Sequence, residues 1–173
     1  MKRRKAIQNI VAVGAATTLL PACNFFQEPL KVYENLPLDR TQRTILSKLS
    51  ETILPKIGLD KLSTPEPTLD FMLTMLNDCS PKADIEKYLA GFADFQTYLS
   101  EKYQQSFSNL QPAQVTELLT FLTTSEEVPE NVKYFFNTTN SLTQKHFKSS
   151  EYYMKNYLDF EFAPGHYEGC ATV

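Results

Sequence analysis

The chain has 173 residues, of which 42% are hydrophobic and 21% charged, enough for one folded domain with a modest core. Four of its 17 Lys and Arg residues stand at positions 2–5, so residues 23–173 carry 13 of them against 20 Asp and Glu, a formal net charge of −7. This acidic balance argues against nucleic acid as a partner, since that would need a basic face.

The first 22 residues have the pattern of an export signal. Four cations at positions 2–5 precede an apolar run from Ile10 to Ala22. The run is too short for a bilayer core, which needs about 20 apolar residues, and a short run behind a positive head is typical of a signal peptide. The alternative is a buried first helix, which four leading cations disfavour. We therefore predict that residues 1–22 are an export signal.

The pair Arg3-Arg4 leaves two export routes open. It fits a twin-arginine signal, which carries folded cargo, but signals for unfolded chains also tolerate two arginines. Ala6 and Ile7 stand where the usual twin-arginine pattern has Phe and Leu.

The export signal ends in a second motif. Leu20-Pro21-Ala22-Cys23 looks like a bacterial lipobox, with a branched residue three positions before Cys and a small residue just before it. We predict that Cys23 becomes the lipidated N-terminus of an exported, membrane-anchored protein; each buried methylene of the lipid adds about 0.8 kcal/mol of membrane affinity. The alternative is ordinary cleavage that leaves Cys23 as a free thiol.

Two further cysteines remain, Cys79 and Cys170. In an oxidising compartment they can form a disulfide, and we predict one that pins the irregular tail, residues 159–173, to the helical core. The alternative is two reduced thiols, because connectivity cannot be read from a sequence.

The rest of the chain is predicted to be an all-α domain, a compact bundle of about five to six helices over residues 41–173 with an irregular C-terminal tail. Residues 23–40 lack a periodic pattern and are predicted to be a tether. Apolar residues then recur at helical spacing in six segments. These segments are 41–54, the stretch around 69–76, 81–107, a helix opening at Pro112, one opening at Pro129, and a short one capped by Ser149.

Local signals set several helix ends. Pro55 stops the first helix. Ser80 is predicted to cap the third helix, with Pro81 at its first position. Residues 120–124 are ambiguous between helix and strand.

Residues for catalysis are scarce. His146 and His166 are the only histidines, and there is no nucleotide-binding or nucleophile motif. Neither histidine lies at the short spacing that a zinc site needs. The acidic residues Glu126, Glu127 and Glu130 are explained by the helix start beside them. We therefore predict no catalytic, cofactor-binding or metal-binding residue in this chain.

Aromatic residues gather toward the C-terminal end. At helical spacing they belong to a core or to a docking face, and the sequence leaves both readings open. They are Phe135, Phe136, Phe147, Tyr152, Tyr153 and Tyr157.

Several segments together resemble the gluconate 2-dehydrogenase subunit 3 family. The start Met1-Lys2-Arg3-Arg4-Lys5-Ala6-Ile7, the block Glu51-Thr52-Ile53-Leu54-Pro55 and the ending are similar to it. The ending consists of Phe147-Lys148-Ser149-Ser150-Glu151-Tyr152-Tyr153 and Ala163-Pro164-Gly165-His166-Tyr167-Glu168-Gly169-Cys170. Residues 63–68 lack the Pro-Gly-Ala turn that is associated with the family.

The resemblance implies a non-catalytic accessory subunit in the periplasm. Its partner would be a large, FAD-containing dehydrogenase of the glucose-methanol-choline type that oxidises a sugar, sugar acid or polyol and passes electrons to a cytochrome c. The small subunit would carry the export signal, escort the folded enzyme and attach it to the membrane. A flavin enzyme binds its cofactor before export, so the resemblance favours the twin-arginine route.

The resemblance also leads us to expect partner docking near the C-terminus, by Phe147, Tyr152, Tyr153, His166 and Tyr167. Two other functions stay open at this point: a solitary envelope lipoprotein with a ligand-binding or structural role, and an enzyme with an unrecognised site.

Overall fold

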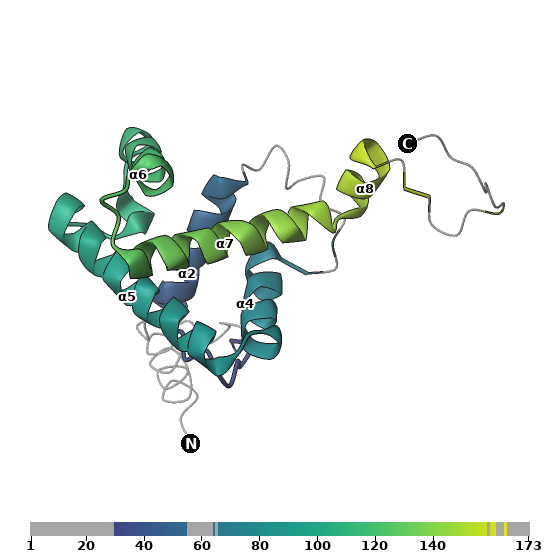
Figure 1. Ribbon diagram of the computed structural model, residues 1–173, viewed down its shortest axis with the longest axis horizontal. Coiled ribbons are helices and arrows are strands. Elements are labelled where there is room, and N and C mark those ends of the chain that lie inside the picture. Colours follow the sequence, from purple (N-terminus) through teal and green to yellow (C-terminus); the bar gives the residue numbers. More distant parts are fainter. Residues whose placement is uncertain (1–29, 55–63, 65, 159, 162–164, 166–173) are drawn as a thin grey trace, which may run out of the picture. The chain divides into compact units, whose positions relative to one another are not determined.

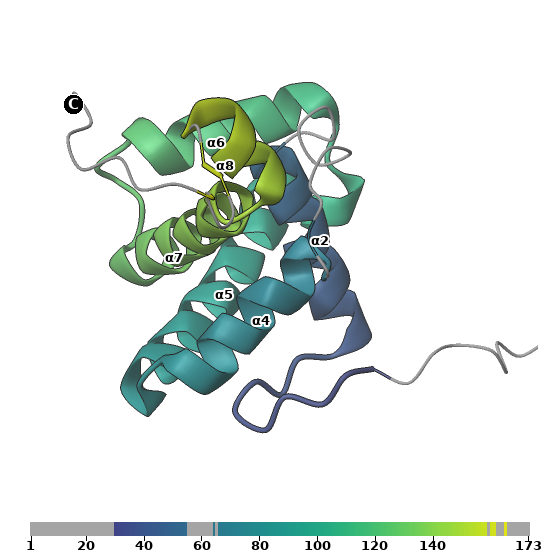
Figure 2. The same cartoon turned by 90° about the vertical axis from the view of Figure 1, so that its right-hand side faces the viewer.

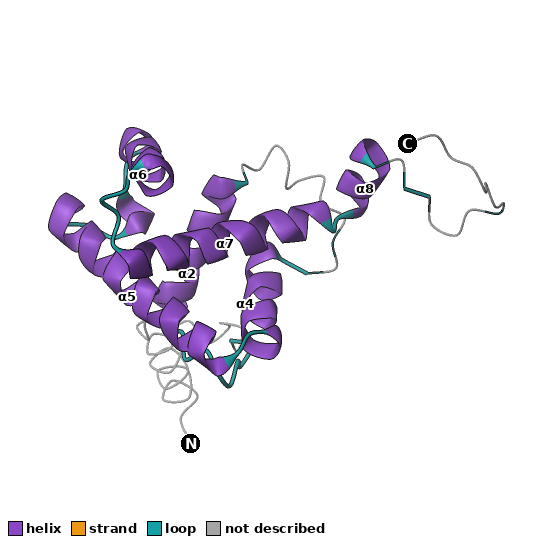
Figure 3. Ribbon diagram, in the orientation of Figure 1, coloured by secondary structure: helices purple, strands orange, loops and turns teal. Residues whose placement is uncertain are grey.

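The computed structural model describes residues 30–54, 64, 66–158, 160, 161 and 165. The chain divides into residues 1–31 and residues 32–173, and all the helices described here belong to the second unit. Within the described residues there are six α-helices, one 3₁₀ helix and no strand (Figure 3). They are α2 (Arg40–Ile53), α4 (Thr68–Cys79), α5 (Lys82–Tyr103), η1 (Phe107–Asn109), α6 (Pro112–Thr124), α7 (Glu130–Lys148) and α8 (Glu151–Tyr157). The prediction of an all-α fold is confirmed.

The helices α5 and α7 cross as the central pair of this unit (Figure 1). The Phe135 ring of α7 is fully buried against Tyr88, Phe92 and Phe95 of α5, at centroid distances of 5.1, 5.1 and 5.3 Å. Such ring pairs add about 0.5–1.5 kcal/mol each beyond the burial of their area. Gly91 of α5 faces the first turn of α7, where it leaves no space for a side chain.

The helices α2 and α4 pack against each other and against α7. Each of them presents one apolar stripe to the core, at the spacing that the sequence predicts. The buried apolar side chains are Ile45, Leu46 and Leu49 of α2, and Met72, Leu73 and Leu76 of α4.

A buried polar seam runs along α7 and joins it to its neighbours. The Tyr88 hydroxyl and Thr139 Oγ1 lie 3.0 Å apart, and the Thr143 hydroxyl donates to the Thr139 carbonyl at 2.8 Å and contacts Met72 Sδ at 3.2 Å. Burial raises the pKa of Tyr88 above its usual range, so this hydroxyl stays protonated. Because a buried hydroxyl without a partner is costly, these contacts favour one register of α4 and α5 against α7.

Part of the segment predicted to be a tether is packed on the helices. Tyr33, Leu36 and Leu38 are 6% exposed or less and belong to the same apolar core as α2 and α5. Asn35 binds Asn77 of α4 through both its backbone N–H and its side-chain amide. Figure 2 shows the segment that precedes α2 as a loop below α2 and α4. The sequence prediction missed this because the three apolar residues follow neither a helical nor a strand period. Residues from Val32 onward therefore belong to the helical unit.

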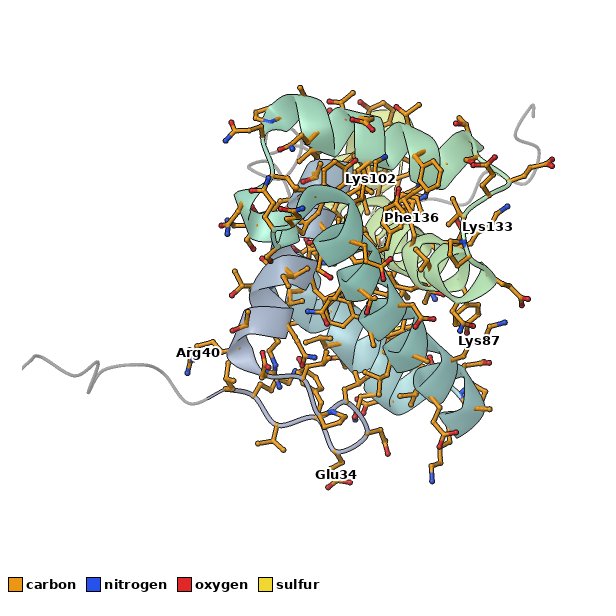
Figure 4. The ribbon with its side chains drawn as sticks, turned by 90° about the vertical axis from the view of Figure 1, so that its left-hand side faces the viewer. Glu34, Arg40, Lys87, Lys102, Lys133 and Phe136 are labelled. Carbon is orange, nitrogen blue, oxygen red and sulfur yellow. The ribbon has the colours of Figure 1, made fainter. Side chains whose placement is uncertain are left out.

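One lysine links α6 to the end of α5. Lys102 lies beside α6 (Figure 4). It forms an ion pair with Glu117 of α6 at 2.9 Å, and its Nζ lies 5.2 Å from the centre of the Phe121 ring. The Phe121 ring in turn stacks on Tyr98 of α5 at 5.6 Å. The Glu117 carboxylate is the main cause of a raised pKa at Lys102, so the lysine keeps its charge.

Several predicted helix ends are shifted by a few residues. Ser80 is the C-cap of α4 and Pro81 precedes the first residue of α5, so Ser80 is not the N-cap that the sequence suggested. The helix α5 ends at Tyr103 rather than near residue 107, because Gln104 takes a left-handed conformation with φ of 54°. The ambiguous residues 120–124 are helical.

Candidate surface for partner docking

The predicted docking aromatics that the structure describes lie together where α7 meets α8. Phe147 lies in the last turn of α7, and its ring contacts Tyr153 of α8 edge to face at 5.4 Å. Tyr157 then stacks on Tyr153 at 5.2 Å and meets Tyr152 at 6.3 Å. Phe147, Tyr152 and Tyr153 are half-buried. His166 and Tyr167, the other predicted docking residues, lie outside the described residues.

Two serines build the corner between α7 and α8. The Ser149 hydroxyl donates to the His146 carbonyl at 2.8 Å, and the Ser150 hydroxyl donates to the Phe147 carbonyl at 2.6 Å. Ser150 Oγ also accepts from the Tyr153 N–H at 3.2 Å, which makes Ser150, and not Ser149, the N-cap of α8. Ser150 is fully buried, so this corner fixes the direction in which α8 leaves α7.

Apolar side chains at the end of α8 are exposed to solvent. Tyr157 is 62% exposed, Leu158 58% and Phe160 48%. The N–H groups of Leu158 and Phe160 both donate to the Met154 carbonyl, which holds Phe160 at the end of α8. Leu158 and Phe160 are not among the predicted docking residues, although they belong to an apolar cluster whose spacing does not place it in the core. We call the side chains of Phe147, Tyr152, Tyr153, Tyr157, Leu158 and Phe160 the α8 aromatic surface.

His146 lies beneath this corner, at the joint between α7 and α4. It is 2% exposed, its Nδ1 is 3.1 Å from Thr68 Oγ1, and its ring lies 4.8 Å from the ring of Phe71. Its Nε2 has no hydrogen-bond partner among the described residues. Burial lowers the pKa of His146, and the nearby Glu66 carboxylate and backbone only partly offset this effect. His146 is therefore a neutral, buried residue where α7 meets α4.

We predict that acidification lowers the free energy of unfolding because His146 takes up a proton more readily in the unfolded chain. Since its pKa is lowered by folding, the unfolded chain takes up this proton first as the pH drops below about 6.5, and the free energy of unfolding decreases from there. In His146→Asn the amide can replace Nδ1 toward Thr68 but does not titrate. Urea unfolding at pH 7.5 and 5.5 should show a larger loss for the wild type than for the variant. Equal losses would contradict the assignment.

The structure brings no catalytic group together in the part of the chain that it describes. No three His, Cys, Asp or Glu side chains there are close enough to hold a metal ion. A groove of about 270 Å³ near the C-terminal end of α5 is lined by amides, hydroxyls and two aliphatic side chains, so it offers no general acid or base. Its lining residues are Ile45, Gln96, Leu99, Ser100, Gln104, Gln105 and Ser106.

The remaining predicted sites stay predictions. Cys79 is exposed at the end of α4 and forms no disulfide within the described residues, while Cys170 lies outside them. Arg3, Arg4 and Cys23 also lie outside the described residues. None of the described helices is both long and apolar enough to cross a membrane.

Comparison with known families shows to which family the chain belongs. Residues 40–165 match the model of the family described as gluconate 2-dehydrogenase subunit 3. The chain belongs to this family. The match begins with α2 and runs through α8, so the α8 aromatic surface falls inside the part shared with gluconate 2-dehydrogenase subunit 3 proteins. The comparisons with curated proteins and with solved structures found no match.

Proposed function

We propose that this chain is the non-catalytic accessory subunit of a flavin-dependent dehydrogenase complex. The observation that carries the proposal is the family match, which covers every described helix and names the family as a subunit of gluconate 2-dehydrogenase. The proposed partner is a large FAD-containing subunit of the glucose-methanol-choline type. It oxidises a sugar, sugar acid or polyol and passes the electrons to a cytochrome c.

The small subunit is proposed to act in export and attachment rather than in chemistry. Its leader, with Arg3 and Arg4, would direct the folded complex to the periplasm. The α8 aromatic surface supports a docking role, because aromatic side chains are enriched at protein interfaces. A solitary envelope lipoprotein would need neither a partner nor a folded-protein export route.

Co-expression tests this function directly. The large subunit is expressed with and without this chain, and sugar-dependent dye reduction is measured in the cytoplasmic, periplasmic and membrane fractions. With the chain present, activity should appear in the membrane and periplasmic fractions; without it, activity should remain in the cytoplasm. Equal export of the enzyme in both strains would contradict the escort function.

Membrane attachment makes a separate prediction. Cys23→Ala removes the thiol that would carry the lipid, so the mature chain, expressed without its partner, should move from the membrane fraction to the soluble periplasmic fraction. Cys79→Ala is the control, because Cys79 lies outside the lipobox: it removes one partner of the predicted disulfide but keeps Cys23, so the chain should stay on the membrane. A Cys23→Ala chain that stays membrane-bound would show that the anchor is elsewhere.

A further inference from the structure

The helix α8 is held in place but stays partly exposed. None of its seven residues is buried, although a helix of this length is unstable in isolation. What holds it is the corner made by Ser150, the ring contact between Phe147 and Tyr153, and the closing bonds to the Met154 carbonyl. The chain thus maintains a short helix that contributes little to its own core.

The exposed apolar side chains are concentrated at this helix. The large hydrophobic side chains that are exposed among the described residues are Leu30, Val32, Tyr157, Leu158 and Phe160. Three of these five lie within four consecutive positions at the end of α8, where they continue the row of rings that begins at Phe147. Single exposed apolar residues need no explanation, but a contiguous group marks an interaction site.

The charges of α8 favour a protein groove over a membrane surface. Its charged residues, Glu151 and Lys155, form an ion pair with each other, so the helix has no net charge. An interfacial membrane helix depends on free basic side chains and on a longer apolar face. A neutral helix with tyrosine and phenylalanine at its tip fits an apolar groove that receives a helix as its ligand.

We propose that α8 is the docking helix for the large dehydrogenase subunit: Tyr157, Leu158 and Phe160 enter an apolar groove of that subunit, and Ser150 positions them. This inference rests on the proposed function. Ser150 has a positioning role in this proposal: its hydroxyl is buried and cannot contact a partner, but it fixes the direction in which α8 leaves α7.

The test compares variants of the full chain co-expressed with the large subunit. Leu158→Ser combined with Phe160→Ser removes two exposed side chains without touching the core, and Val32→Ser, at 84% exposure, is the matched control. After affinity capture, the double variant should bind the large subunit at least roughly 30-fold more weakly than the wild type, as expected for central interface residues. Val32→Ser should bind like the wild type.

A second comparison tests the positioning role. Ser150→Ala should weaken binding, whereas Ser150→Thr keeps a hydroxyl at the cap and should restore it. Far-ultraviolet circular dichroism and thermal unfolding establish that each variant is folded.

The outcomes separate this inference from the function on which it rests. If the wild type does not bind the large subunit, the accessory function fails and the docking assignment fails with it. If the wild type and the double variant bind equally, only the α8 assignment is overturned. Two other results also overturn the α8 assignment. If the double variant still binds the large subunit but no longer binds phosphatidylglycerol vesicles, the surface binds a membrane. If the double variant is a monomer where the wild type is a dimer, the surface binds a second copy of this chain.

Discussion

Gly91→Ala is expected to destabilise the helical unit strongly, although alanine is the better helix former. A Cβ at position 91 would lie 2.2 Å from the Asn131 carbonyl oxygen and 2.9 Å from Phe135 Cβ. The nearer atom belongs to the backbone of α7, so the clash can be removed only if α5 and α7 move apart. Helix propensity favours Ala by about 1 kcal/mol, but overpacking of a fixed core costs typically 1–3 kcal/mol and more against backbone.

The net loss should be roughly 2–3 kcal/mol, which corresponds to a fall in Tm of about 10 °C for a unit of this size. Separation of the helices would also open the contacts between Phe135 and the rings of α5. Thermal and urea unfolding measure the change. The control is Ala90→Gly, one position earlier on the exposed side of α5, which should cost only the propensity term of about 1 kcal/mol. A Gly91→Ala protein as stable as the wild type would contradict the close helix approach.

Arg3→Lys combined with Arg4→Lys is expected to stop export of the chain almost completely and to leave its partner in the cytoplasm. The exchange keeps the positive charge of the leader. A signal for unfolded chains needs only that charge, whereas the twin-arginine route reads the arginines themselves. Fractionation and immunodetection of both proteins, together with dehydrogenase activity, measure the effect.

The control for this experiment lowers the charge and keeps the pair. Lys2→Gln combined with Lys5→Gln should still export both proteins, because Arg3 and Arg4 remain. Normal periplasmic accumulation of the double lysine variant would show that the chain uses the route for unfolded proteins. The large subunit would then need its own way across the membrane.

The helices themselves were predictable from the sequence because each one repeats its own pattern. Leu46 and Leu49, or Phe92 and Phe95, stand at spacings that only a buried helix face explains. Which side chains of α5 are fully buried was less predictable: Leu89 is only half-buried, while its neighbour Tyr88 is fully buried. The hydroxyl of Tyr88 is satisfied by Thr139, 51 residues away, and a contact at that separation leaves no local trace.

The same limit applies to the candidate site. The expectation that Phe147, Tyr152 and Tyr153 dock a partner came from the family resemblance, and the structure places Phe147 at the end of α7 and the two tyrosines in α8. The exposure of Leu158 and Phe160 was not predictable, because whether the fold covers a short apolar cluster does not follow from its spacing in the sequence. The packed segment around Leu36 was missed for a related reason: its core contacts depend on the fold and follow no period.

Membership of a complex is the central claim, and co-purification tests it most directly. The full-length chain is tagged at its C-terminus, captured from mild-detergent extracts of membranes that retain sugar-dependent dye reduction, and its largest bound protein is identified. We predict that a larger, FAD-containing dehydrogenase dominates the eluate and carries the activity with it. A chain that elutes alone, while the dehydrogenase activity stays in the unbound extract, would contradict the account.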